Sequence, residues 1–241
     1  MTTPEDSTIL SIVIPAYNEN DRLGNSLDRI LSYVKGRHIP FEMIVVDDGS
    51  KDETVRVARE KLSGVSHQVI ENGVNRGKGF SVRRGVQAAK GKYVLFTDAD
   101  LSTPIEEIEK LMPYLEKGYD LAIGSRGVQS SQVEVHQNVL RETMGRTFNV
   151  IAHAVAFRGI KDSQCGFKLF KNEAAQSLFE HQKIDGFCFD AEVIFLAQKM
   201  GYRIAEVGVR WMNSPQSKVR ILGDSLRMLI DLVRIRLLHM C

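Results

Sequence analysis

Short apolar runs alternate with amphipathic stretches along most of this chain. The runs at 9–14, 41–46 and 93–97 have the length and the branched or aromatic side chains typical of buried strands. Each is followed by a stretch with apolar residues three or four positions apart, at 21–35, 52–62 and 105–117, which predicts helices. Regular alternation of strand and helix predicts a mostly parallel α/β sheet flanked by helices.

The second half continues this pattern less regularly. Apolar runs at 119–125, 167–170 and 202–211 predict further strands, and 80–89, 173–179 and 190–200 predict helices. Apolar residues at helical spacing between 132 and 157 predict a mainly buried helix. We therefore expect a disordered N-terminus at 1–8, one domain at 9–218 and a final amphipathic helix at 219–241.

The predicted final helix is basic as well as apolar. Arg220 and Asp224, and likewise Arg227 and Asp231, are four positions apart and can pair along one helix face. A basic amphipathic helix is typical of a membrane-surface anchor or of a docking helix for a protein partner. An ordinary packed terminal helix fits the same pattern.

Composition narrows the class of protein. The 241 residues are 43% hydrophobic and 26% charged, and the net charge of +2 gives no indication of a nucleic-acid partner. Three widely separated cysteines lack metal-ligand spacing and fit a reducing compartment. Because no apolar run reaches the roughly 18–20 residues of a membrane span, we expect a cytoplasmic protein that is soluble or peripheral.

Two carboxylates follow the strand predicted at 93–97. Alternating side-chain directions place Asp98 and Asp100 on one side and Ala99 on the other, so two hard oxygen ligands can meet one divalent cation on a diphosphate. The alternative is a polar turn in which Asp100 or Ser102 caps the next helix. The cation site and the capping turn can both be present.

Other polar clusters also stand at predicted strand ends or helix starts. The loop 75–79 is rich in glycine and basic residues and suits a phosphate, although such a loop is often only a turn. Asp47 and Asp48 follow the second predicted strand. Asp190 and Glu192 open a predicted helix, where Asp190 can simply be the N-cap.

Five motifs in fixed order give this chain a family resemblance. They are IPAYNE at 14–19, VDDGS at 46–50, NRGKG at 75–79, DAD at 98–100 and QCGFK at 164–168. Together they strongly resemble inverting family 2 glycosyltransferases, which have the nucleotide-sugar-binding GT-A fold. DADLSTP at 98–104, QCGFKLF at 164–170 and FDAE at 189–192 are most similar to the dolichyl-phosphate β-glucosyltransferase branch.

The resemblance implies a role for each matching residue. Those of the donor site would line the nucleotide, hydrogen-bond uracil and ribose, or hold Mg²⁺ or Mn²⁺ on the diphosphate of UDP-glucose: Pro15, Ala16, Tyr17, Glu19, Asp47, Asp48, Lys78, Asp98, Ala99 and Asp100. Arg126, Arg141 and Arg146 would bind an acceptor phosphate. Asp162, Asp190 and Glu192 would recognise the sugar or act as base, and Lys218 would close over the donor.

The resemblance also implies an activity. We expect metal-dependent, inverting transfer of glucose from UDP-glucose to a polyprenyl monophosphate, dolichyl or undecaprenyl, at the cytosolic membrane face. Ser102 favours glucose because mannosyl relatives usually carry glutamine at that position. Eukaryotic glucosyl members resemble this chain after an N-terminal membrane span, so we expect the terminal helix to make the membrane contact here. The alternatives are GDP-mannose as donor, a polysaccharide or protein acceptor, and a non-catalytic nucleotide-sugar-binding module; a homo-oligomer is compatible with each.

Overall fold

The computed structural model describes residues 8–135, 156–212 and 221–240. The strands are β1 Leu10–Ala16, β2 Phe41–Asp47, β3 His67–Glu71, β4 Tyr93–Thr97, β5 Leu121–Ser125, β6 Gln132–Val135, β7 Phe167–Lys171, β8 Ile204–Gly208 and β9 Arg210–Met212. The helices are α1 Asn20–Gly36, α2 Thr54–Leu62, α3 Lys78–Ala88, the 3₁₀ turn η1 Ile105–Glu107, α4 Ile108–Glu116, α6 Asn172–His181, α7 Phe189–Lys199 and α8 Ile221–Leu238.

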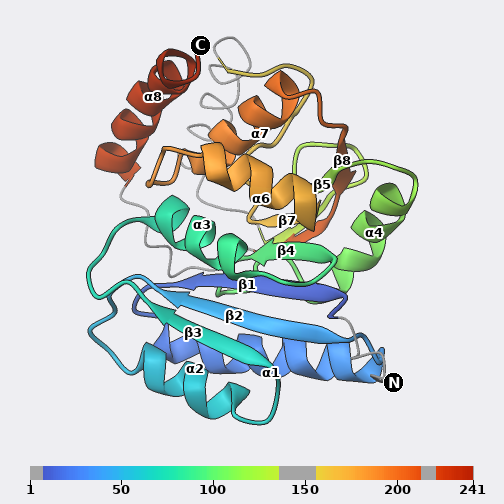
Figure 1. Cartoon of the computed structure of the whole chain (residues 1–241), viewed down its shortest axis with the longest axis vertical. Helices are drawn as coiled ribbons and strands as arrows, with labels where there is room; N and C mark the ends of the chain where they lie inside the picture. The colour runs from blue at the N-terminus through green and yellow to red at the C-terminus, as the bar shows by residue number, and fades with distance from the viewer. Residues whose placement is uncertain (1–7, 136–155, 213–220, 241) are drawn as a thin grey trace, which may run out of the picture.

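The main sheet has the strand order β3-β2-β1-β4-β7-β5-β8 (Figure 1). The pairs among β3, β2, β1 and β4, and the pair β5–β8, are parallel, which confirms the predicted mostly parallel sheet. β7 lies antiparallel between β4 and β5. Its first residue therefore meets the carboxyl ends of its neighbours, and the turn before β7 lies at the edge where parallel sheets bind ligands.

Helices cover both faces of the sheet, as Figure 1 shows. Strand residues of opposite parity enter two separate cores, because successive side chains of a strand point to opposite faces. Val13, Val46 and Phe96 pack with α3, α6, α7 and α8, whereas Ile12 and Val45 pack with α1, α2 and α4. This three-layer arrangement fixes the strand ends that carry the polar motifs.

Two predicted elements differ in the structure. The run 202–211 forms two strands in different sheets, because the chain leaves the main sheet after Gly208 and β9 pairs with β6. The helix predicted from residue 132 is wrong for 132–135, which form β6; the sequence QVEV alternates with a period of two, as a strand does. Residues 136–155 are outside the described part. Over the described residues, no helix has the length and apolarity required to span a bilayer.

Candidate active site

Asp47 ends β2 with one carboxylate oxygen in use and the other free. Its Oδ2 accepts hydrogen bonds of 3.0 Å from the backbone N–H groups of Gly49 and Ser50. Its Oδ1 is buried and has no hydrogen-bond partner among the described residues. Because an unpaired buried acceptor is costly, this oxygen is suited to an N–H donor of a ligand.

Asp48 organises the glycine-rich loop 75–79. Its Oδ1 accepts from the backbone N–H of Arg76 and from Asn72 Nδ2, at 2.9 and 2.8 Å, and its Oδ2 accepts from the Gly77 N–H at 2.9 Å. Gly77 has a φ of 108°, a conformation that favours glycine. Asp48 is buried, and its carboxylate is bonded to the backbone of the loop. Its contact with ribose stays a prediction.

Asp98 and Asp100 follow β4 at the same edge. Lys78, the first residue of α3, pairs with Asp98 through Nζ and Oδ1 at 2.7 Å. Burial disfavours the charged lysine, but the nearby carboxylates of Asp98 and Asp190 outweigh it and raise the pKa of Lys78. Asp100 accepts a 3.0 Å hydrogen bond from the Ser102 N–H, so the polar turn is present. The predicted helix cap is wrong, because η1 begins after Pro104 and no side chain caps it.

Gly166, in the turn before β7, leaves the space that Asp98 occupies. A Cβ atom at this position would lie 2.7 Å from Asp98 Oδ1 and far inside contact distance of Oδ2. The Asp98 N–H donates to the Gly166 carbonyl at 3.2 Å. The glycine of the QCGFK motif therefore leaves the space that the Asp98 carboxylate needs.

Arg22 is a cation at this edge that the sequence reasoning missed. Its guanidinium pairs with both carboxylate oxygens of Glu19 and reaches Asp100 Oδ2 at 3.5 Å. These carboxylates raise the pKa of Arg22, chiefly through the hydrogen bond to Glu19. The only sequence signal was a basic residue three positions after Glu19 in a predicted helix.

Lys168 and Asp190 form a buried ion pair beneath the site. Lys168 Nζ contacts Asp190 Oδ1 and donates to the Cys165 carbonyl at 2.6 Å. Burial raises the pKa of Asp190, against the lowering effect of Lys168 and Lys78. Both ammonium groups lie near the Phe96 ring, at 5.3 Å for Lys78 and 5.8 Å for Lys168. The sequence places Lys168 in the QCGFK motif but predicts no role for it.

Arg126 follows β5 and is held in a fork by Asp162. Its Nε and Nη2 donate to the two Asp162 oxygens at 2.7 and 2.8 Å, and its backbone N–H donates at 2.9 Å. Burial opposes both charges, but their mutual attraction prevails, lowering the pKa of Asp162 and raising that of Arg126. The guanidinium carbon also lies 5.4 Å from the centre of the Trp211 ring.

The remaining predicted residues lie partly at this sheet edge, partly in the interior and partly outside the described residues. Pro15 and Ala16 end β1, and Tyr17 and Glu19 follow at the same edge. Ala99 is buried. Glu192 is fully buried in α7, where its oxygens accept the backbone N–H groups of Lys183 and Ile184. Arg141, Arg146 and Lys218 lie outside the described residues.

The carboxylate pair fits a divalent cation only with help from a ligand. Asp98 and Asp100 keep side-chain exposures of 32% and 18%, and their oxygens are the hard donors that Mg²⁺ or Mn²⁺ prefers. Across the part of the chain that the structure describes, no three His, Cys, Asp or Glu side chains gather into a metal cage. Any cation here would complete its shell with diphosphate oxygens and water.

Acids and a glycine-rich basic loop stand at the carboxyl edge of this α/β sheet, which is where proteins of this class bind their ligands. The sequence model of "Glycosyl transferase family 2" matches residues 11–179. The chain belongs to this family of glycosyltransferases.

Curated relatives extend the match to nearly the whole chain. The dolichyl-phosphate beta-glucosyltransferase of Dictyostelium discoideum is 37% identical over 97% of this chain and 75% of its own length. The enzymes of the same name from Homo sapiens and Saccharomyces cerevisiae are 35% and 33% identical over 96% and 98% of this chain, and 76% of their own lengths in both cases.

Solved structures support the fold. Glucosyl-3-phosphoglycerate synthase of Mycobacterium tuberculosis has a TM-score of 0.70 at 20% identity, over 95% of this chain and 80% of its own; one of its structures is a complex with Mn²⁺, UDP-glucose and glycerol 3-phosphate. Mannosyl-3-phosphoglycerate synthase of Rubrobacter xylanophilus has a TM-score of 0.68 at 20% identity, over 95% of this chain and 72% of its own. The predicted GT-A fold is confirmed.

Proposed function

We propose that this enzyme transfers glucose from UDP-glucose to a polyprenyl monophosphate, such as dolichyl phosphate, with inversion and with Mg²⁺ or Mn²⁺. The acceptor class is supported by the names of the relatives, which match along nearly the full chain. The donor is supported by the site. The free buried oxygen of Asp47 suits the N3–H of uracil, and a carboxylate pair stands beside a lysine for the diphosphate.

The residues at the sheet edge divide the proposed reaction between them. An oxygen of the acceptor phosphate attacks the anomeric carbon, and the bond from that carbon to the UDP oxygen breaks. The acceptor is already ionised near neutral pH, so it needs no strong base. Arg126, fixed by Asp162, would orient the phosphate, and Lys78 would stabilise charge on the leaving UDP. A cation held by Asp98 and Asp100 would supply further charge neutralisation.

Asp100→Asn tests the proposed metal site and the donor together. The substitution keeps the size of the side chain but removes a charged ligand, so we expect Mn²⁺ to enhance UDP binding at least tenfold less than in the wild type. Titration calorimetry of UDP and GDP, each with and without Mn²⁺, measures this effect. Equal enhancement in the variant and the wild type would remove Asp100 from the metal site, and tighter binding of GDP than UDP would contradict the donor.

Asp162→Asn tests whether the two hydrogen bonds from Arg126 to Asp162 orient the guanidinium for the acceptor. An amide places N–H hydrogens where Arg126 needs an acceptor, so the guanidinium is released. We expect the KM for polyprenyl phosphate to rise roughly tenfold, while the KM for UDP-glucose changes less than twofold. Asp120→Asn is the matched control, because Asp120 also pairs with a basic side chain, that of Lys171, but lies before β5 at the opposite sheet edge. An equal rise in both KM values would contradict the assignment.

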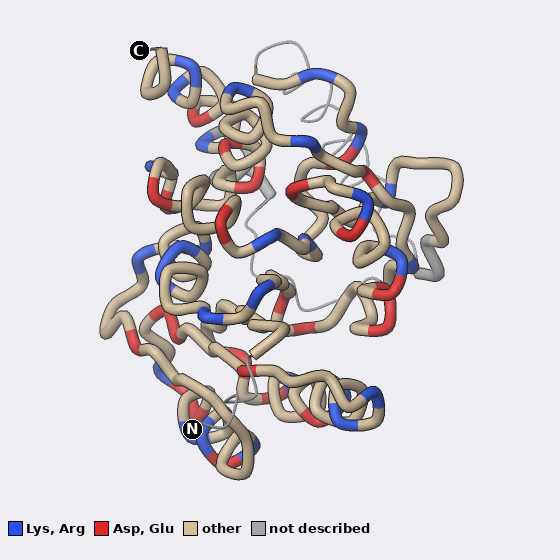
Figure 2. Tube along the Cα trace, turned by 45° about the vertical axis from the view of Figure 1, so that its right-hand side comes forward, with Lys and Arg blue, Asp and Glu red and all other residues tan. Residues whose placement is uncertain are grey.

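The terminal helix offers a surface for the membrane that would hold the lipid acceptor. Met228, Leu232 and Ile235 of α8 are buried against the domain, so one side of the helix is packed. A second apolar stripe faces outward: Ile230, Val233, Leu237 and Met240 are each more than half exposed. Exposed Arg227, Arg234 and Arg236 lie among them, and Figure 2 shows this basic character along the helix that leads to the C label.

We further propose that this stripe rests on the cytosolic face of an anionic membrane. Apolar side chains would enter the headgroup boundary while the arginines meet lipid phosphates. The triple variant Ile230→Ser, Val233→Ser and Leu237→Ser should bind anionic vesicles roughly tenfold more weakly, with an unchanged melting temperature because all three side chains are exposed. Co-sedimentation measures it, with neutral vesicles as comparison. Unchanged binding would contradict the proposal.

A further inference from the structure

The segment 182–186, between α6 and α7, contacts two parts of the molecule that are far apart in sequence. On one side it touches the glycine-rich loop and the start of α3, which carries Lys78. On the other side it is held by Glu192 of α7, which also contacts the end of α8. The proposed reaction assigns no role to this segment.

Its contacts with the donor side are made largely by backbone. The Phe80 N–H donates to the Asp185 carbonyl at 3.1 Å, and Arg83 Nη1 donates to the Gln182 carbonyl at 2.9 Å. A Cβ atom on Gly79 would lie 2.5 Å from the Ile184 carbonyl oxygen, so only glycine lets the two backbones approach. The segment therefore packs against the first turn of α3, and neither can move far without the other.

Glu192 fixes the opposite side of the segment. Its Oε1 accepts the Lys183 N–H at 2.9 Å, and its Oε2 accepts the Ile184 N–H at 2.8 Å. The same Oε1 lies 2.7 Å from His239 Nε2, just after α8. Glu192 is fully buried, so each of these contacts is made without competition from water.

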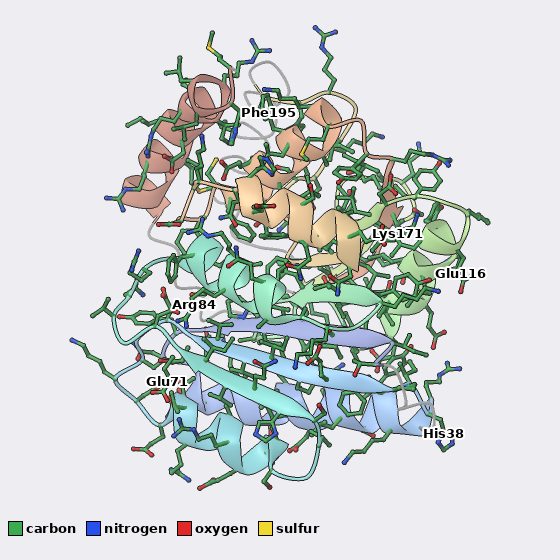
Figure 3. The ribbon with its side chains drawn as sticks, in the orientation of Figure 1. His38, Glu71, Arg84, Glu116, Lys171 and Phe195 are labelled. Atoms are coloured by element: carbon green, nitrogen blue, oxygen red, sulfur yellow. The ribbon has the colours of Figure 1, made fainter. Side chains whose placement is uncertain are left out.

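The end of α8 is joined to the same region by further bonds. Lys183 Nζ donates to the Leu238 carbonyl at 3.0 Å, and the Lys199 ammonium donates to the His239 carbonyl. The Phe195 ring, labelled on α7 in Figure 3, lies 6.1 Å from the His239 ring. These carbonyls are among those that a helix end leaves without partners, so the lysines also cap α8.

We infer that Glu192 is a positioning residue for the donor site and that, with His239, it joins the terminal helix to the glycine-rich loop through segment 182–186. Because both of its oxygens hold backbone N–H groups, Glu192 sets where the segment lies. The segment in turn sets where α3 begins and where Lys78 points toward Asp98. The inference rests on the proposed function only for the identity of the nucleotide.

Amide hydrogen exchange and UDP binding test this role in the full chain. In Glu192→Gln, the amide nitrogen faces a backbone N–H that needs an acceptor, so the segment shifts. We expect the amides of residues 79–81 to exchange at least tenfold faster than in the wild type and the Kd for UDP to rise roughly tenfold. His239→Ala, which leaves Glu192 in place, is the second variant if Glu192→Gln does not fold, and we expect the same changes to a smaller extent.

Leu232→Ala is the matched control. It removes a buried side chain of α8 that takes no part in the polar link, so it reports the effect of loosening the helix alone. We expect it to lower the free energy of unfolding but to leave exchange at 79–81 and UDP affinity within twofold of the wild type. Wild-type exchange in the folded variants, or an equal acceleration in Leu232→Ala, would overturn the inference. Exchange is measured without a ligand, so it decides the inference even if UDP is not the nucleotide.

Discussion

Gly166→Ala is expected to remove activity while leaving the protein folded. The added methyl group would overlap the Asp98 carboxylate, which is the movable end of a side chain rather than backbone. Asp98 can turn away at small cost, so we expect the melting temperature to change by only a few degrees. It then leaves Lys78 and the proposed metal position, and the rate of UDP release should fall roughly a hundredfold or more.

Gly64→Ala is the matched control for Gly166→Ala. A Cβ atom at Gly64 would meet no other atom within 4 Å, so this variant reports the effect of a glycine-to-alanine change in open space. We expect its activity and melting temperature to stay close to those of the wild type. If Gly166→Ala retained more than about a tenth of the wild-type rate, the position of Asp98 would not matter as argued.

Lys168→Met should be the most destabilising of the variants considered. It leaves the Asp190 carboxylate buried without its main partner, and breaking such a pair costs about 3–5 kcal/mol. For a chain of this length, we expect the melting temperature to fall by roughly 10 °C. Thermal or denaturant unfolding measures the change.

The double variant Lys168→Met, Asp190→Leu separates packing from chemistry. With both charges removed, no buried charge is left alone, so most of the lost stability should return. We expect activity to stay low, because Lys78 also loses the nearby carboxylate that helps to keep it charged. If activity returned together with stability, Asp190 would be a structural residue only, and its predicted catalytic role would be wrong.

Much of the fold follows from local pattern. β1, β2 and β4 are short apolar runs followed by helices, and this repetition was sufficient to predict a mostly parallel sheet. The position of β7 could not be predicted, because it pairs with β4 and β5, which lie far from it in sequence, and in the opposite direction. The division between β8 and β9 likewise depends on β6, whose residues the helical spacing of 132–157 wrongly assigns to a helix.

The candidate site shows the same limit. Asp47 ends β2, and Asp98 and Asp100 follow β4, so the sequence could place all three at the carboxyl edge, where the structure has them. The contact of Arg22 with Asp100 exists because β1 and β4 are neighbours, and the fit of Gly166 to Asp98 depends on β7 pairing with β4. Both are consequences of strand order, which no local pattern specifies.

Release of UDP from UDP-glucose tests the central claim most directly. The purified chain is mixed with UDP-glucose, polyprenyl phosphate and Mn²⁺, and each component is omitted in turn; GDP-mannose replaces the donor in a parallel reaction. We predict UDP release that requires both the lipid phosphate and the metal, with little GDP release from GDP-mannose. Release from GDP-mannose alone, or release from UDP-glucose that is indifferent to the lipid phosphate, would contradict the account.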